Sequence, residues 1–570
     1  MMRTLKCCGW VERCARGTKF GKQIRHHSIS YDETMKTWHS LHKPNFNYLA
    51  NIRHMKHWMK RIGRNMEDLS KLNVLHITGT KGKGSTSAFC ENILRHHGYK
   101  TGVYSSPHLV SITERFLFDG KPVETNVFKD HFWDIYNRLL YSRESEDDMP
   151  HAFAFLTLLA FDLFLAQGVD ALILEVGIGG QYDCTNIVET PTVCGVTSLH
   201  VDHISLLGNT IESVAWHKGG IFKPGTPAVT VPQDPRAMKV LEDRAEEIGT
   251  TLYETPSLAS YDNGPEPIRL GIPGHVQNVN ASLALQMCKI WLKTGGNGFR
   301  KTSADEIISS TIMKRSEKAQ GFKLTDSIKN GLAQTNLPGR AHIISRPGVT
   351  YYLDTAHTDL SIQHCAEWFD QKADEERSKL NGRVARVLIF YGAEGRDQRK
   401  HLSILQQRLP LDAVIFTPYA SPTEDCSIDY IYDKTTKEEQ FANVLSFKEF
   451  WDDNTSTTNP IPTEGKRSGK PCASFTARSF PEALIAATGG RDLSIRGIGD
   501  FISEGKYRMT SSGDLYRDPS VTHATTKDGI CLDYPQLPEQ VQNADHVQIL
   551  LAGGFKIIGH GLWYLRGKLF

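Results

Sequence analysis

The chain has 570 residues, of which 39% are hydrophobic and 23% charged, as is typical of a globular protein with more than one domain. Its formal net charge of +2 gives no global indication of nucleic-acid binding. The 11 cysteines include no Cys-x-x-C pair, which disfavours a zinc site and indicates reduced thiols in a reducing compartment.

Residues 1–30 are rich in basic side chains, with seven Lys or Arg residues against a single acid, Glu12. This composition is typical of a mitochondrial targeting segment, although the low serine content also allows a disordered basic tail. We therefore expect a mitochondrial and/or cytoplasmic protein. The most apolar stretch, residues 152–166, is too short to span a membrane and contains Asp162, so it predicts a buried core helix.

Residues 31–72 are expected to be helical, and a strand at 74–77 then leads into a glycine-rich loop at 79–86 and a helix at 87–96. A strand, a glycine turn and a helix make a phosphate-binding loop, because backbone N–H groups and the helix N-terminus converge on the anion. The match to the P-loop pattern is partial, since Ile77 occupies a position that is usually Gly. A purely structural turn is the alternative.

Three further strand ends carry polar residues. A strand at 100–104 leads to Ser106 and Pro107, and a buried strand at 170–176 carries Glu175 near its end. A strand at 191–198 is followed by His200, Asp202 and His203. Ligands bind at the carboxyl ends of parallel strands, so Glu175 is a candidate metal ligand. An exposed acid and structural histidines are the alternatives, and Lys218 before two glycines could simply end a helix.

The alternation of strands and helices continues to about residue 300 and predicts an α/β fold with a doubly wound parallel sheet of the P-loop type. A smaller C-terminal α/β, Rossmann-like domain is expected at 338–570, after a first domain at 31–335. Its strands are predicted at 349–356, 387–390, 414–417 and 546–553, with a helix at 358–369. Residues 452–471 are rich in Ser, Thr, Pro and Lys and predict a disordered insertion.

Several ordered motifs together resemble the folylpolyglutamate synthase family of the eukaryotic type, within the Mur ligase superfamily. They lie at 76–86, 105–109, 175–186, 202–208, 216–223, 337–340 and 354–358, and the resemblance extends from about residue 31 to the end. It implies an ATP-dependent amide ligase, with tetrahydrofolate synthase / folylpolyglutamate synthase activity. ATP would phosphorylate the γ-carboxylate of a reduced folate, and the amine of L-glutamate would attack the acyl phosphate to give ADP and phosphate.

The resemblance also implies the roles of individual residues. ATP would be bound by Gly82, Lys83, Gly84, Ser85, Arg340, Asp354 and His357, and magnesium (Mg2+) by Ser106, Glu175 and His203. The residues expected to act in catalysis are Lys83, Lys218 and His203, and Lys218 matches a lysine that is carbamylated in related ligases. A monovalent cation is a further candidate cofactor. No nucleic-acid partner and no membrane span are expected, and a monomer is the default.

Four residues depart from the family's usual motifs: Thr113, Leu337, Thr355 and Tyr391. The Cβ of Thr355 restricts a backbone position that is usually Gly. These departures concern the acceptor more than the chemistry. Two alternatives therefore stay open: a related ligase that joins an amino acid to a different carboxylic acid, and a catalytically silent protein that binds nucleotide or folate.

Overall fold

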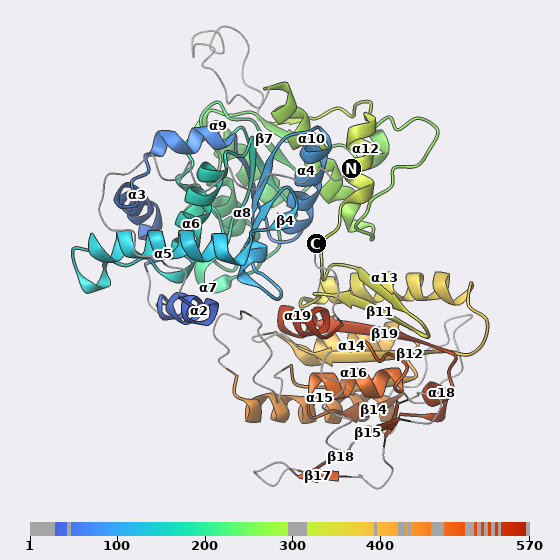
Figure 1. The fold of residues 1–570 in the computed structure, drawn as a ribbon. Helices are drawn as coiled ribbons and strands as arrows, with labels where there is room; N and C mark the ends of the chain where they lie inside the picture. Colours follow the sequence, from blue (N-terminus) through green and yellow to red (C-terminus); the bar gives the residue numbers. More distant parts are fainter. Residues whose placement is uncertain are drawn as a thin grey trace, which may run out of the picture.

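The computed structural model describes residues 29–42, 47–294, 316–392, 396–419, 429, 435–457, 472–495 and 537–565, together with four short strands between residues 507 and 533. Nearly all of the predicted targeting segment lies outside these residues. The described chain forms two units that Figure 1 shows one above the other, the first coloured blue to green and the second yellow to red.

Nine strands of the described chain form the sheet of the first unit. They are β1 (Leu75–Thr78), β2 (Thr101–Tyr104), β3 (Phe116–Phe118), β4 (Lys121–Pro122), β5 (Ala171–Glu175), β6 (Val193–Val196), β7 (Ala228–Thr230), β8 (Leu252–Glu254) and β9 (Ser316–Lys318). Their order is β4-β3-β2-β5-β1-β6-β7-β8-β9, with parallel pairing except for the antiparallel β2-β3-β4 edge.

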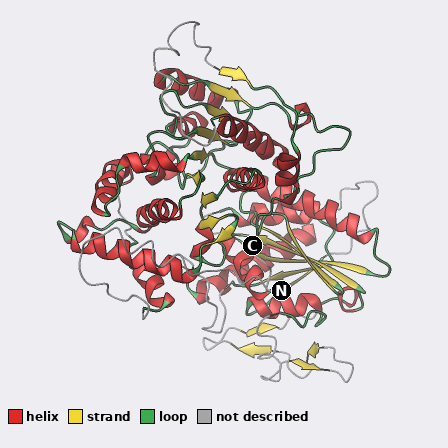
Figure 2. Cartoon of the chain, turned by 45° about the horizontal axis from the view of Figure 1, so that its top comes forward, coloured by secondary structure: helices red, strands yellow, loops and turns green. Residues whose placement is uncertain are grey.

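Helices cover both faces of this sheet, as Figure 2 shows. The longer ones are α2 (Tyr31–Ser40), α3 (Asn51–Arg61), α4 (Lys83–His96), α5 (Thr125–Tyr141), α6 (Ala152–Gln167), α8 (Ile211–Gly219), α9 (Pro235–Ile248), α10 (Val276–Lys293) and α12 (Asp326–Gln334). Alternate residues of β5 enter different apolar clusters: Leu172 and Leu174 pack with α5 and α6, and Ala171 and Ile173 with α4 and α10. A strand buried on both faces is what a doubly wound sheet requires, so the predicted fold class is confirmed.

The second unit has six strands in its described sheet, ordered β10-β11-β19-β12-β13-β14. Their bounds are β10 (His342–Arg346), β11 (Val349–Asp354), β12 (Val384–Tyr391), β13 (Ala413–Phe416), β14 (Ala473–Thr476) and β19 (His546–Gly553). Its helices are α13 (Asp359–Arg377), α14 (Gln398–Arg408), α15 (Lys437–Thr457), α16 (Phe480–Thr488), α18 (Glu539–Gln542) and α19 (Phe555–Tyr564). Within this six-stranded sheet, antiparallel pairing is confined to β10, and α13 lies on the side that faces the first unit (Figure 1).

Two predictions about these elements can be compared with the structure. The apolar stretch 152–166 is the buried helix α6, whose Asp162 is paired with Arg64 at 2.7 Å and His131 at 2.9 Å. No helix in the described ranges is long and apolar enough to cross a membrane. The prediction of a disordered insertion at 452–471 is wrong for its first six residues. They continue α15 to Thr457, because Trp451 fixes the helix in the core. Residues 458–471 lie outside the described ones.

Candidate active site

A cavity of about 1680 Å³ lies between the two units. Strand ends of the first sheet meet α13 and the start of α19 there, so both units supply its walls. The predicted site residues that line it are Gly82, Lys83, Gly84, Ser85, Ser106, Glu175, His203, Arg340, Asp354 and His357. The structure thus brings together ten of the eleven predicted residues, although they come from six separate segments of the chain.

The glycine-rich loop runs from the end of β1 into α4, which begins at Lys83 rather than at residue 87. Gly82 caps the helix with φ +96°, a backbone conformation that favours glycine. A Cβ at this position would lie 2.2 Å from Asn280 Oδ1, so the close packing of α10 also requires glycine. The N–H groups of the first turn of α4 therefore open toward the cavity, as phosphate binding needs.

Two lysines meet at this loop. Lys83 Nζ donates to Gly79 O at 3.2 Å and lies 3.8 Å from Glu175 Oε1. Lys218 Nζ donates to the same carbonyl at 2.8 Å, but Lys218 is buried behind the loop and is not part of the cavity wall. Burial, with Lys83 close by, lowers the pKa of Lys218 well below its ordinary value.

Glu175 ends β5 in the centre of the sheet and is buried. Burial raises the pKa of Glu175, whereas Lys83 and the backbone N–H of Ser106 oppose the shift by favouring the carboxylate. The Ser106–Pro107 peptide bond is cis. A buried carboxylate with its lysine at 3.8 Å can accept a cation from the cavity, since the ion pair leaves it incompletely satisfied.

His203 stands further along the same edge, because β6 pairs with β1 and not with β5. Its backbone is left-handed, with φ +50°. Burial lowers the pKa of His203, so the imidazole is neutral and able to act as a ligand. The preceding Asp202 accepts a hydrogen bond from Arg396 Nη2 at 3.0 Å, which is an ion pair between the two units.

The second unit supplies a cationic and aromatic wall. Arg340 Nη1 donates to Thr355 O at 2.8 Å and lies 4.0 Å from Asp354 Oδ1, while its guanidinium lies over the ring of Phe555. Burial raises the pKa of Asp354 to about 6, against the opposing effect of Arg340. His357 Nε2 is 3.5 Å from Lys81 Nζ of the glycine-rich loop, so the wall reaches the phosphate-binding turn directly.

The comparisons with known proteins agree with this geometry. Residues 77–288 match the Mur ligase middle domain. The chain is 35% identical to the mitochondrial folylpolyglutamate synthase of Bos taurus, over 97% of this chain and 95% of the relative. It is 38% identical to that of Homo sapiens, over 95% and 93%.

The chain belongs to the folylpolyglutamate synthase family. Its fold is also that of two solved structures. A Mycobacterium tuberculosis folylpolyglutamate synthase complexed with ADP and AMPPCP has a TM-score of 0.58 at 19% identity, covering 94% of this chain and 99% of that one. E. coli FolC in complex with DHPP and ADP has a TM-score of 0.58 at 20% identity, covering 95% and 99%. At such identities the two structures establish the two-domain fold alone.

The four departures from the family motifs are accommodated locally. Thr355 has no positive φ, so the Cβ that was expected to restrict the backbone does not strain it. Leu337 and Thr355 line the cavity. Thr113 is buried, with its hydroxyl 2.9 Å from Ser111 Oγ. Tyr391 is buried with its ring against Tyr419.

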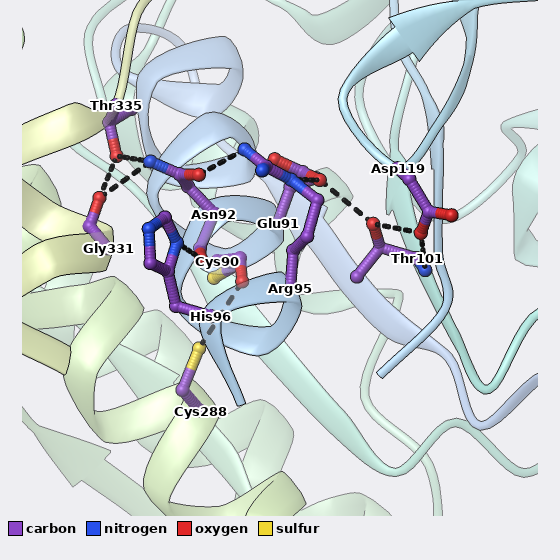
Figure 3. A network of polar contacts seen from close by, with 10 residues as sticks. All are labelled: Cys90, Glu91, Asn92, Arg95, His96, Thr101, Asp119, Cys288, Gly331 and Thr335. Carbon is purple, nitrogen blue, oxygen red and sulfur yellow. Dashed lines mark hydrogen bonds and ion pairs between the residues drawn. The ribbon is translucent and has the colours of Figure 1, made fainter. Parts of the chain in front are cut away.

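A polar network anchors the helix that follows the phosphate-binding loop (Figure 3). Thr101 Oγ1 donates to Glu91 Oε1 at 2.8 Å, which ties α4 to the first residue of β2. On the other side, Asn92 Nδ2 donates to Gly331 O at 2.8 Å and to Thr335 Oγ1 at 3.3 Å. Because Arg340 follows Thr335 by five residues, α4 is fixed to the start of β2 and to the linker into the second unit.

The motifs did not single out several residues of this site. Lys81 and Arg396 carry charge at the contact between the units, and Phe555 supplies the ring beneath Arg340. Lys81 lies inside the glycine-rich loop and could have been found as a second basic residue there. Arg396 and Phe555 follow predicted strands, but no spacing shows that those strand ends face the first sheet.

Proposed function

We propose that the chain catalyses the ATP-dependent addition of L-glutamate to the γ-carboxylate of a reduced folate, releasing ADP and phosphate. The observation that carries this proposal is the cavity between the two units, which joins the glycine-rich loop to Arg340 and Asp354 in a chain of this family. The family members named above are folylpolyglutamate synthases along nearly their whole length. Residues 31–335 and 338–570 act as the two domains.

The chemistry requires activation of a poor electrophile. Phosphorylation of the γ-carboxylate replaces an oxide leaving group with phosphate, after which the glutamate amine attacks and the tetrahedral intermediate collapses to the amide. The protein contributes positioning and charge neutralisation rather than covalent catalysis. Gly82, Gly84 and Ser85 cradle the phosphates with backbone N–H groups, and Lys83 neutralises the outer phosphate.

The remaining residues complete the nucleotide site and its support. Arg340 and Asp354 bind the nucleotide from the second unit, with His357 beside Lys81. Lys218 is assigned a supporting role, because its bond to Gly79 O fixes the turn from behind. Since neither unit holds all of these groups, ATP binding needs both units together.

Magnesium is part of this proposal. Glu175 and Ser106 fit such an ion, because oxygen donors are those that magnesium prefers and the buried carboxylate has its lysine only at 3.8 Å. His203 offers a neutral nitrogen and would complete the set at the edge of the cavity. The described residues contain no cluster of three His, Cys, Asp or Glu side chains placed for a metal, so water would supply further ligands. When bound, the ion would neutralise charge on the transferring phosphate.

A phosphate-release assay tests the function. The purified chain is given ATP, L-glutamate and either tetrahydrofolate or a set of other carboxylic acids. We expect release that requires both glutamate and tetrahydrofolate, and a product heavier by one glutamate. Release that is indifferent to the folate would instead favour a ligase with another acceptor.

Mitochondrial targeting is proposed separately. The basic composition of residues 1–30 supports it, as do the names of the mitochondrial relatives. A fusion of residues 1–40 to a fluorescent reporter should localise to mitochondria, and a diffuse cytosolic signal would contradict the assignment.

A further inference from the structure

Arg115 is a buried arginine whose two terminal nitrogens have no hydrogen-bond partner among the described residues. It ends the short 3-10 helix Ile112–Arg115, is 3% exposed, and nevertheless lines the cavity. Its Nε donates to His108 Nδ1 at 2.9 Å. Within the described ranges, neither Nη1 nor Nη2 has a hydrogen-bond acceptor and no carboxylate lies within 4.0 Å, yet neither nitrogen is sealed from solvent. Four N–H groups therefore remain for a ligand in the cavity.

The position of Arg115 in the sheet indicates which ligand. The strand order β3-β2-β5-β1 places the phosphate-binding loop after β1 and Glu175 at the end of β5. Arg115 immediately precedes β3, and its carbonyl accepts a hydrogen bond from Ser105 N at 3.1 Å at the end of β2. Glu175 thus lies between the phosphate-binding loop and Arg115. Arg115 is on the side from which the acceptor must present its carboxylate to the γ-phosphate.

We propose that Arg115 binds a carboxylate of the terminal glutamate of the acceptor, an inference that rests on the proposed function. A guanidinium with both Nη groups free is planar and matches a carboxylate with two parallel hydrogen bonds. An unpaired buried cation is costly, and an anionic ligand removes that cost when it binds. The same cavity is also lined by Phe153 and Ile178, apolar surface that suits the aromatic part of a folate.

His108 holds the guanidinium in place. Burial and the adjacent Arg115 lower the pKa of His108 well below its ordinary value, so the imidazole is neutral. Because Nδ1 accepts from Arg115, the proton lies on Nε2, which donates to the carbonyl of Asp429. His108 is therefore a positioning residue that links the arginine to the second unit.

Asp429 belongs to the second unit and is firmly docked on the first. Its N–H donates to Val110 O at 2.9 Å, and its Oδ2 accepts from Ile112 N at 2.9 Å and from the hydroxyl of Tyr31. Val110 also packs into the apolar core of the second unit. The orientation of Arg115 consequently depends on contact between the units, which couples acceptor binding to the assembly of the ATP site.

The test is steady-state kinetics of Arg115→Lys with tetrahydrofolate, ATP and L-glutamate. Lysine keeps the charge but loses the fork, so we expect the KM for tetrahydrofolate to rise about 10- to 100-fold while the KM for ATP stays within about twofold. Equilibrium binding of tetrahydrofolate should weaken by the same factor. The matched control is Arg61→Lys: Arg61 is partly buried, is saturated by Asp148 and Leu139 O, and does not line the cavity, so its substitution should leave both constants unchanged.

Two further arms keep the test decisive. His108→Ala should raise the KM for tetrahydrofolate and His108→Asn, whose Oδ1 can accept from Arg115, should restore much of the loss. An acceptor with γ-aminobutyrate in place of glutamate lacks the α-carboxylate. If Arg115→Lys no longer raises the KM for this acceptor, Arg115 binds the α-carboxylate. If the rise in KM persists, Arg115 binds the γ-carboxylate.

Two results would overturn the inference: a folded Arg115→Lys enzyme with an unchanged KM for tetrahydrofolate, or an equal rise in the KM for ATP. Failure of the proposed function is a separate outcome, since the unsubstituted chain would then release no folate-dependent phosphate.

Discussion

Gly82→Ala gives a sharp test of the phosphate-binding loop, because the chain contains a matched control. Gly82 has φ +96° and Gly98, at the far end of α4, has φ +86°. Alanine at either site pays about 1–2 kcal/mol for the left-handed backbone. At Gly98 the added Cβ meets nothing within 4 Å, whereas at Gly82 it would lie 2.2 Å from Asn280 Oδ1 and 3.0 Å from Asn280 Cγ. The two substitutions therefore share the backbone cost, and Gly82→Ala adds a collision within the phosphate-binding loop.

The collision must displace the loop or α10 by roughly 1 Å, because carbon and oxygen do not approach closer than about 3.2 Å. Asn280 is buried and donates to Gln277 Oε1 at 2.9 Å, so it cannot easily turn away. A displacement of that size at a reacting group costs about 100-fold in rate. We expect kcat/KM for ATP to fall about 100-fold in Gly82→Ala and to stay within twofold in Gly98→Ala, with both measured by phosphate release. Equal activities in two folded variants would refute the reasoning.

Three further predictions concern single side chains. Lys83→Met should lower phosphate release at least 100-fold without unfolding the chain, since it removes the charge that faces the outer phosphate; a circular-dichroism melt checks the fold. Asn92→Ala removes the amide that bonds Gly331 O, Thr335 Oγ1 and Arg95, and should cost about 1–3 kcal/mol in urea unfolding, more than Thr335→Val, which leaves the bond between Asn92 and Gly331 O in place. Asp354 should govern the acid side of stability and activity: burial raises its pKa from 3.8 to about 6, so between these values the folded chain holds a proton that the unfolded chain has released. Its contribution to the free energy of unfolding therefore falls as pH rises from about 4 to 6. Asp354→Asn should abolish this fall, which is measured by comparing unfolding at pH 4.5 and 7. The same substitution should remove the acid limb near pH 6 from the pH profile of kcat/KM for ATP.

Local patterns were sufficient to predict the first sheet and the phosphate-binding loop. Buried strands such as β5 are continuous apolar runs, and Gly79 and Gly82 of the loop have a backbone conformation that few other residues adopt. The start of α4 was placed four residues late, because the loop and the first helical turn share the same Gly-Lys-Gly-Ser sequence. The end of α15 was missed for a related reason: Ser and Thr suggest disorder, but the buried Trp451 keeps that turn helical.

The rest of the site depends on contacts that no local pattern encodes. Lys218 was expected to act in catalysis as the match of a carbamylated lysine, and its amine lies behind the turn, bonded to Gly79 O. Its part in catalysis stays a proposal, because a motif specifies a residue and not the side of the loop it approaches. Arg115 illustrates the opposite situation. It stands beside Glu114 in one motif, and nothing in the motif alone indicates that the two charged residues have different roles. The difference between them is visible in their partners: Glu114 accepts three backbone N–H bonds and is satisfied, whereas four N–H groups of Arg115 have no acceptor in the described part of the chain. A satisfied buried charge needs only its own loop, but an unsatisfied one needs a ligand, and the carboxylate of the acceptor is the anion that the proposed reaction brings to that place.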